Sequence, residues 1–256
     1  MQDRGREADT WKNLMSNLTI LYSGGLDSYI AYFYGRAHSY VPELVYVDLG
    51  HPYAEKEKRA IGKNGLPCTM LDFSSLYPAI KSRLSNQIIP SRNLLFAVLG
   101  GMVNERVWIG ALDGEQNGKE RDKSERFFQL STELLTYINN FFQARTIVES
   151  PFAQITKSEV IAWGIANGVP KEKLFDTVSC YDPVHDKCGE CLTCYKRYTA
   201  FLLNDLEEPG YNSPPLTGDY AREMEHEIPR AAEHKDYSRF TKRRIAEHME
   251  LMQLMK

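Results

Sequence analysis

Apolar and polar residues alternate along the chain in blocks of two kinds. Short runs of apolar and β-branched residues are typical of buried strands, and longer segments with apolar residues three and four positions apart are typical of helices. The runs that predict strands are residues 18–23, 43–50, 68–73, 107–112 and 146–152. The segments that predict helices are residues 25–38, 53–65, 91–106, 124–143 and 156–168. The last helix has a capping-box start, Thr156 with Glu159, and a glycine at its end.

This alternation predicts an α/β fold with a doubly wound, mainly parallel sheet. A strand, a helix and a second strand form a parallel unit because the helix carries the chain back to the start of the sheet. In such sheets, ligands bind beyond the carboxyl ends of the strands. Ser23, Asp48 and Asp113 lie at or just past predicted strand ends, so we expect the functional site there.

Composition divides the chain into three parts. Residues 15–176 hold the predicted sheet with its helices, and residues 177–203 hold a dense group of cysteines. Residues 204–256 form a connector rich in proline and glycine, followed by a charged tail. We expect this tail to be partly helical, with Pro229 as an interruption. Such a tail is either a dimerisation or partner-binding helix or a solvated one.

The overall composition is ordinary for a globular protein, with 43% hydrophobic and 25% charged residues and a net charge of -3. This balance gives no broad basic surface, so nucleic acid is not an expected partner; the basic run 241–244 lies beside acidic residues and is weak support for one. No apolar stretch is long enough to span a bilayer. The polar first residues lack the apolar core of a signal peptide, so we expect a cytoplasmic protein without a membrane partner.

A glycine-rich loop follows the first predicted strand and precedes a helix. It consists of Ser23, Gly24, Gly25, Leu26, Asp27 and Ser28. Glycines let the backbone approach phosphate oxygens, the start of the helix offers free N–H groups, and the serine hydroxyls add donors. The carboxylate of Asp27 would repel a phosphate unless a cation such as Mg²⁺ bridges the two. The alternative is an ordinary strand-to-helix turn.

Four of the five cysteines fall within one short segment and are spaced like metal ligands. They are Cys180, Cys188, Cys191 and Cys194. In a reducing compartment such a cluster is more often a metal site than a set of disulfides. Four thiolates suit a tetrahedral structural Zn²⁺ site, although a redox pair and an iron–sulfur cluster are rival interpretations. Cys68 stands apart, and we expect it to be a small buried core residue.

The loop lacks the Lys-Ser/Thr of a Walker A sequence and the G-x-G-x-x-G of a Rossmann fold, and it resembles the PP-loop of the ATP pyrophosphatases. Together with the cysteine set, it resembles the QueC family of 7-cyano-7-deazaguanine synthases. Further stretches are similar to that family: "IPSRN" at 89–93, "TKSEV" at 156–160, "TVSCYDP" at 177–183 and "CGECLTCYKR" at 188–197. Ser91 stands where the family has glycine.

The resemblance implies a PP-loop domain at 15–176, with the fold of the adenine nucleotide alpha hydrolases, and a zinc-binding knuckle at 177–203. It implies that ATP adenylates the carboxylate of 7-carboxy-7-deazaguanine, that ammonia then gives an amide, and that a second ATP-driven step dehydrates the amide to the nitrile. The loop would hold pyrophosphate with Mg²⁺. The family also suggests a homodimer.

The resemblance further assigns roles to single residues. Asp27, Lys157 and Arg92 would be catalytic, with the two cations offsetting charge on the departing pyrophosphate. Without the resemblance, Arg92 and Lys157 would be interpreted as solvated helix ends. The residues expected to bind the nucleotide are the six of the loop together with Asp48, Asn93 and Asp113, and those expected to bind zinc are Cys180, Cys188, Cys191 and Cys194.

Two loops and the tail depart from the family. The stretch "DLGHPYAE" keeps Asp48 but has His51-Pro52-Tyr53 where the family usually reads Gln-Arg-His, and "ERDKSERFF" has Lys123-Ser124 in place of Cys-Arg. A second hypothesis is therefore a QueC-like enzyme of an anti-phage gene cluster that passes the activated deazaguanine to a protein amine. A third is a non-catalytic nucleotide-binding module, which the intact Asp27 and both loop serines disfavour.

Overall fold

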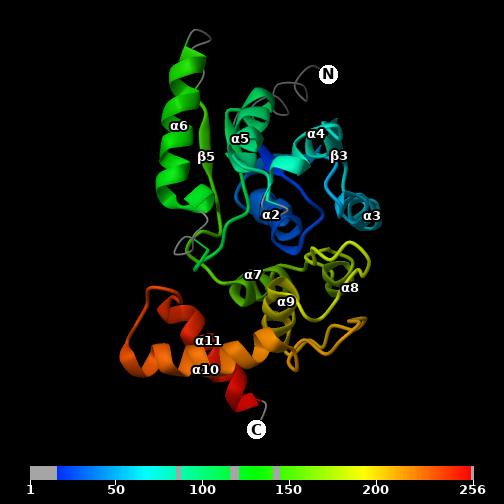
Figure 1. Cartoon of the computed structure of the whole chain (residues 1–256). Helices are drawn as coiled ribbons and strands as arrows, with labels where there is room; N and C mark the ends of the chain where they lie inside the picture. The colour runs from blue at the N-terminus through cyan, green and yellow to red at the C-terminus, as the bar shows by residue number, and fades with distance from the viewer. Residues whose placement is uncertain (1–15, 85–87, 116–120, 141–144, 255–256) are drawn as a thin grey trace, which may run out of the picture.

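The fold is built on a parallel sheet, as the alternation of strands and helices predicts. The computed structural model describes residues 16–84, 88–115, 121–140 and 145–254. In these residues the five-stranded sheet has the order β3-β2-β1-β4-β5, and every neighbouring pair is parallel (Figure 1). The strands are β1 (Ser16–Leu21), β2 (Tyr40–Asp48), β3 (Cys68–Asp72), β4 (Arg106–Trp108) and β5 (Ile147–Glu149).

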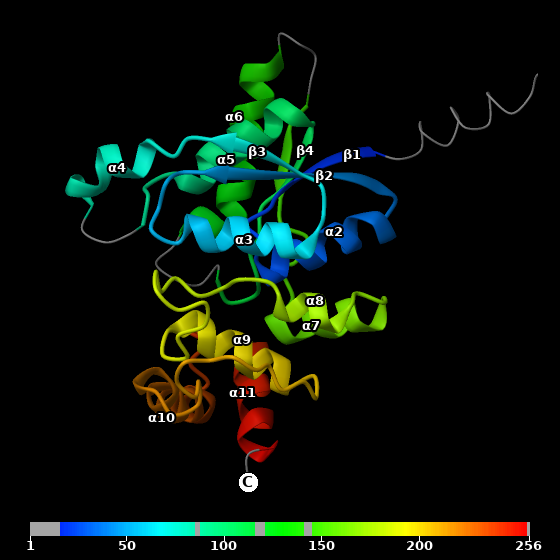
Figure 2. The same ribbon diagram turned by 90° about the vertical axis from the view of Figure 1, so that its right-hand side faces the viewer.

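Helices cover both faces of this sheet (Figure 2). The helices on one face are α2 (Leu26–Ala37), α3 (Ala54–Asn64) and α7 (Lys157–Ala166). The helices on the other face are α4 (Leu76–Ile80), α5 (Arg92–Val103) and α6 (Glu125–Asn139). The strand order switches direction at β1, with β2 and β3 to one side and β4 and β5 to the other. This arrangement confirms the doubly wound α/β prediction, and it puts the expected ligand crevice at the carboxyl end of β1.

Strands β4 and β5 are shorter than the predicted runs 107–112 and 146–152. Beyond them, the Ser150 side chain replaces the regular backbone ladder. Its Oγ accepts a hydrogen bond from the N–H of Ala111 at 3.1 Å and donates one to the Ala111 carbonyl at 2.8 Å. Because a side chain takes these backbone groups, the two segments leave the sheet early.

The predicted helix boundaries agree with the structure where capping residues define them. Thr156 Oγ1 accepts from the N–H of Glu159, and the Glu159 carboxylate accepts from the N–H of Thr156, which confirms the capping box. Gly65 ends α3 with a left-handed φ of 72°. The predicted helix 124–143 corresponds to α6, and residues 141–143 lie outside the described residues. Cys68 is only partly buried, because it begins the edge strand β3.

The remaining helices lie outside the sheet and its two helical layers. Two turns of 3₁₀ helix span Lys81–Arg83 and Arg121–Lys123. A further layer lies against α7 on the side away from the sheet (Figure 2). Its helices are α9 (Leu192–Leu202), α10 (Asp219–His234) and α11 (Lys242–Leu254), whereas α8 (Lys171–Phe175) lies beside α7 and packs into the core through Leu174. Across the described ranges, every helix is too short or too polar to span a bilayer.

The prediction that Pro229 interrupts the tail is wrong, because α10 continues through it. Proline lacks one N–H donor and crowds the preceding turn, which costs free energy inside a helix. Ala221, Met224 and Ile228 offset this cost, since they are buried along one face of α10 and pack with Tyr195 of α9. Tertiary burial thus decides the structure of the tail.

Candidate active site

The glycine-rich loop joins β1 to α2 and is held by two neighbouring segments. Gly24 has a φ of +69°, and a Cβ there would lie 3.0 Å from the backbone oxygen of Glu57. The Gly24 carbonyl accepts a hydrogen bond from the N–H of Val178 at 3.0 Å. A Cβ on Gly25 would lie 3.1 Å from Ser23 Oγ. The glycines therefore let α3 and the segment before the cysteines approach the loop closely.

The side chains of the loop lie in different environments. Leu26 is buried in the core, whereas Ser23 is exposed. The hydroxyl of Ser28 donates to the Gly25 carbonyl at 3.0 Å and so closes the first turn of α2. Among the described residues, no side chain caps α2 at Gly25. The start of this helix therefore keeps backbone donors for an anion.

Asp27 and Lys157 meet directly, although they are 130 positions apart in the sequence. Nζ of Lys157 lies 2.5 Å and 2.7 Å from the two carboxylate oxygens of Asp27. Asp27 is in the first turn of α2, and Lys157 begins α7 directly after the Thr156 cap. Both side chains are partly exposed. The pair therefore brings a cation and a carboxylate able to hold Mg²⁺ to the same end of the loop.

Asp48 ends β2 and shapes the turn that follows it. Its Oδ1 accepts from the N–H of Gly50 at 2.8 Å, and its Oδ2 pairs with Nζ of Lys58 at 2.9 Å. Gly50 has a φ of +71°, and a Cβ there would lie 1.9 Å from the backbone oxygen of Ser74. The turn therefore requires glycine, and two neighbours already engage the carboxylate of Asp48.

The same turn carries two buried rings that stack on each other. The rings of His51 and Tyr53 stack with their centroids 3.8 Å apart, and Tyr181, which follows Cys180, lies 5.0 Å from Tyr53. The guanidinium of Arg92 donates to Tyr53 OH at 3.4 Å. Nδ1 of His51 and Nε of Arg92 are buried without a hydrogen-bond partner among the described residues. We call these four side chains the aromatic cluster; His51 and Tyr53 are buried in it, whereas Tyr181 is half exposed.

Glu57 of α3 connects the aromatic cluster to the loop. Its Oε2 accepts from Tyr46 OH at 3.0 Å and lies 3.4 Å from Nε2 of His51. Burial raises the pKa of Glu57 to about 7, and burial together with the nearby charge of Arg92 lowers the pKa of His51 to about 4. At neutral pH His51 is therefore uncharged, and Glu57 is divided between its two forms. Sequence analysis missed Glu57 because it lies in a charged run typical of an exposed helix.

The start of α5 places Arg92 in the aromatic cluster. Ser91 precedes the helix with a left-handed φ of 58°, a conformation that glycine adopts most readily. Asn93 is buried, and its Nδ2 donates to the backbone oxygen of Asp122 at 3.1 Å. Asn93 therefore fixes the loop that carries Asp122 and Lys123 beside the site.

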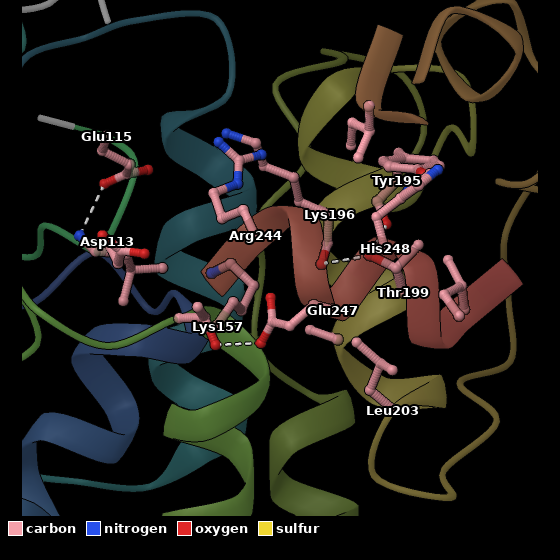
Figure 3. Close-up of a pocket in the computed structure, with 15 residues that line it drawn as sticks. Asp113, Glu115, Lys157, Tyr195, Lys196, Thr199, Leu203, Arg244, Glu247 and His248 are labelled. Atoms are coloured by element: carbon pink, nitrogen blue, oxygen red, sulfur yellow. Dashed lines mark hydrogen bonds between the residues drawn. The ribbon is translucent and has the colours of Figure 1, made fainter. Parts of the chain in front are cut away.

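A cleft with a volume of about 70 Å³ lies on the other side of Lys157, between the end of β4, α9 and α11 (Figure 3). We call it the tail-side cleft. Its charged lining residues are Asp113, Glu115, Lys157, Lys196, Arg244 and Glu247. Oδ2 of Asp113 accepts from the hydroxyl of Thr241 at 2.6 Å. Burial and the nearby Arg244 lower the pKa of Lys196 to about 8. Sequence analysis missed Lys196 and Arg244 because nothing in the sequence places the tail against Asp113.

The four cysteines converge as their spacing predicts. Their Sγ atoms all lie within 4.8 Å of one another, with 3.8 Å between Cys188 and Cys194 and 4.0 Å between Cys180 and Cys191. Sulfurs about 2.3 Å from one tetrahedral ion would be about 3.8 Å apart. The four residues therefore fit a single metal ion with thiolate ligands.

Arg197 fastens the cysteine segment to the rest of the protein. It is 1% exposed, and its guanidinium makes paired hydrogen bonds with the carboxylate of Glu208 at 2.6 to 3.0 Å. It also donates to Thr177 Oγ1 at 2.7 Å and to the carbonyl of Leu174 at 2.8 Å. Lys187 also pairs with Glu208, at 2.7 Å. Removal of Glu208 would leave the buried guanidinium of Arg197 without its carboxylate partner, so this pair holds the segment in place. Sequence analysis did not single out either residue.

Comparison with known proteins identifies the family. The family model described as "Queuosine biosynthesis protein QueC" matches residues 59–205, which is more than half of the chain. The chain belongs to the QueC family. The matched residues include Arg92, Lys157 and the four cysteines, whereas the glycine-rich loop precedes the match and α10 and α11 follow it.

Curated relatives of this chain carry the name 7-cyano-7-deazaguanine synthase. The "7-cyano-7-deazaguanine synthase 2" of Sulfurisphaera tokodaii is 26% identical over 223 residues, covering 76% of this chain and 47% of that protein. The synthase of Thermoplasma acidophilum is 25% identical over 215 residues, covering 74% of this chain and 89% of the relative. The synthase of Rickettsia akari is 26% identical over 227 residues, covering 76% of this chain and 98% of the relative. The chain spans about half the length of the first relatives it matches and nearly all of the last.

Proposed function

We propose that the protein is an ATP-dependent ligase that adenylates the carboxylate of 7-carboxy-7-deazaguanine and then joins the acyl carbon to an amine. The observation that carries this proposal is the contact between Asp27 and Lys157 at the glycine-rich loop. It adds a Mg²⁺-binding carboxylate and a cation to the anion-binding start of α2. The named relatives in the QueC family support the choice of substrate.

In this proposal the pyrophosphate part of ATP lies against loop residues 23–28. Backbone N–H groups of α2 and the exposed hydroxyl of Ser23 donate to its oxygens. Asp27 would hold Mg²⁺, which neutralises phosphate charge when it is bound. Lys157 stabilises the charge that builds on the departing pyrophosphate. A module that only bound nucleotide would have no need of these groups in one place.

We assign the deazaguanine ring to the aromatic cluster. The half-exposed ring of Tyr181, which packs against Tyr53, matches a flat heterocycle. The unpaired Nε of Arg92 can bond the substrate carboxylate or the adenylate formed from it. The cluster borders the loop through Glu57, so both substrates would meet at the carboxyl end of β1.

The proposed chemistry proceeds in two bond-forming steps. A carboxylate oxygen of the substrate attacks the α-phosphorus of ATP, the bond to pyrophosphate breaks, and an acyl adenylate forms. The amine nitrogen then attacks the acyl carbon and loses a proton, and AMP leaves. With ammonia the product is an amide, whose oxygen is adenylated by a second ATP, and loss of AMP and a proton gives the nitrile.

A protein amine is the second candidate acceptor. The unusual His51 and Tyr53 and the added surface of α10 and α11 favour it, because a macromolecular acceptor needs more contact area than ammonia. The reaction would then stop at an amide link between the deazaguanine and the protein. Such an enzyme would suit an anti-phage gene cluster.

We propose that the four cysteines hold a structural Zn²⁺ ion. The four thiolates fill every position of a tetrahedral ion, which leaves none open for a reacting ligand. Free thiols persist in the cytoplasm, where we place the protein. The ion would then stabilise the segment that carries Tyr181 and Lys196 rather than take part in the reaction.

We also propose a homodimer that buries the outer face of α6. Leu130, Leu134, Tyr137 and Ile138 recur at helical spacing along this face and are each at least 46% exposed. Exposed apolar sets of this kind mark interfaces. Light scattering should give twice the chain mass for the wild type and the chain mass for Tyr137→Glu; a monomeric wild type would contradict this assembly.

The function is tested by mass spectrometry of a reaction of the purified protein with MgATP, 7-carboxy-7-deazaguanine and ammonium, with AMP measured in parallel. Nitrile together with AMP would establish the nitrile-forming synthase. AMP without nitrile would support the same activation with another acceptor, such as a protein amine. The absence of AMP from folded, zinc-loaded protein would refute the proposed activation.

A further inference from the structure

The tail contributes directly to the space next to the loop, although it lies beyond the residues matched by the family. Thr241 donates to Asp113 just past the end of β4, at 2.6 Å. Glu247 accepts hydrogen bonds from Thr156 and Ser158, which flank Lys157 in sequence. Helix α11 is therefore fixed against both segments that lead into the tail-side cleft.

Arg244 of α11 extends into this cleft beside Lys196 (Figure 3). The chain leaves room for Arg244 at Gly114, where a Cβ would lie 2.4 Å from the arginine Cδ and 3.1 Å from Nη1. Gly114 also has a φ of +80°, which favours glycine. Arg244 of α11 can therefore approach the segment after β4 because residue 114 is glycine.

The two cations lack the partners that the acids of the cleft have. Within the described ranges, neither Arg244 nor Lys196 has a carboxylate at ion-pair distance. The acids, in contrast, are engaged: Asp113 by Thr241, Glu115 by Lys123, and Glu247 by two hydroxyls. Glu115 acts on Lys196, and Glu247 on Arg244, only from beyond ion-pair distance, so an anion in the cleft would give both cations a direct partner.

We propose that Arg244 and Lys196, together with Lys157, form a phosphate-binding subsite for the terminal phosphates of the nucleotide and for the pyrophosphate that leaves. Lys157 contacts Asp27 and lines the cleft, so the subsite continues the glycine-rich loop. The forked guanidinium of Arg244 suits two oxygens of one phosphate. This inference rests on the proposed function and assigns part of the active site to the tail.

The test measures binding of magnesium pyrophosphate to the full chain by calorimetry. Arg244→Gln and Lys196→Gln should each weaken binding about tenfold or more, as expected for loss of a charged hydrogen bond to phosphate. Arg244→Lys should keep part of the affinity. The matched control is Arg243→Gln, which removes a charge from the same helix at an exposed residue paired with Glu159. It should bind within twofold of the wild type.

The outcomes separate this inference from the proposed function. Wild-type binding that Arg244→Gln and Lys196→Gln leave unchanged would overturn the subsite and keep the loop as the pyrophosphate site. Failure of the wild type to bind magnesium pyrophosphate would overturn both the subsite and the loop as a pyrophosphate site. An equal loss in Arg243→Gln would assign the effect to tail docking and overturn the subsite. If Arg244→Gln does not fold, Lys196→Gln on α9 decides.

Discussion

The aromatic cluster and the tail-side cleft border the same loop and differ in chemistry. The aromatic cluster combines stacked rings with an uncharged His51, and it reaches the loop through Glu57. The tail-side cleft offers Lys196 and Arg244, which have no carboxylate at ion-pair distance in the described part of the chain, and it reaches the loop through Lys157. In the proposed function this difference corresponds to a planar heterocycle on one side of the loop and phosphates on the other.

The two regions also differ in origin. The aromatic cluster is built from the turn after β2, the start of α5 and the cysteine segment. The tail-side cleft needs α11, which lies outside the residues matched by the QueC family. Changes in one region should therefore leave the other intact, unless they remove a support that both share.

The cysteine cluster is such a shared support, and its loss should have the largest effect. Tyr181 follows Cys180, and Lys196 comes two residues after Cys194. Cys188→Ala should release the metal and lower the melting temperature by more than about 10 °C, because a structural ion contributes its binding energy to folding. Thermal melting with zinc analysis measures this. Cys68→Ala is the control, and an equal effect in both variants would contradict a metal site.

Loss of the Asp27 carboxylate should come next in size. Asp27→Asn keeps the shape of the side chain but removes the charge that pairs with Lys157 and would hold Mg²⁺. We expect AMP formation to fall about 100- to 1000-fold, the size seen when one group that stabilises charge is removed from an active site. Steady-state AMP release measures the effect, with the exposed Asp219→Asn as the control. Retained activity would remove Asp27 from the mechanism.

The comparison itself is sharpened by one change in each region. Tyr53→Ala should raise the KM for 7-carboxy-7-deazaguanine about tenfold through loss of ring contacts, with pyrophosphate affinity within twofold of the wild type. Arg244→Gln should show the reverse pattern. Both constants are measured for both variants. If each variant changed the two constants equally, the two regions would not bind separate parts of the reactants.

The smallest effect concerns stability and pH at Glu57. Burial raises the pKa of Glu57 from 4.5 to about 7, so the folded protein binds this proton more tightly than the unfolded chain does. The resulting contribution to the free energy of unfolding is complete below pH 4.5 and is lost as the pH rises through 7. Relative to Glu57→Gln, the wild type should lose up to about 3 kcal/mol between pH 4.5 and pH 8. Urea denaturation of both proteins at several pH values measures this. If the difference in the free energy of unfolding between the two proteins did not depend on pH, the raised pKa of Glu57 would be contradicted.

Sequence analysis could predict the features whose residues lie close together in the sequence. The glycine-rich loop is six consecutive residues, the capping box spans Thr156 to Glu159, and four cysteines share one segment. Periodicity gave the α/β class, because each strand and helix buries its own apolar face. The assignments of Asp48, Asn93 and Asp113 to nucleotide binding stay predictions.

Features made by distant segments were missed or wrong. Tyr53 meets Tyr181 only after the sheet has formed, and Arg244 meets Lys196 only after the tail has docked. The ends of β4 and β5 depend on hydrogen bonds from the Ser150 side chain, which no local pattern reveals. Pro229 was expected to break the tail because propensity alone does not include burial against Tyr195.

The most direct test of the central claim follows oxygen atoms from the substrate. 7-Carboxy-7-deazaguanine labelled with oxygen-18 in its carboxylate is incubated with the protein, MgATP and ammonium, and the AMP is analysed by mass spectrometry. If the carboxylate attacks the α-phosphorus, each first-step AMP carries one labelled oxygen from the substrate. Unlabelled AMP, or ADP in place of AMP, would contradict adenylation of the carboxylate.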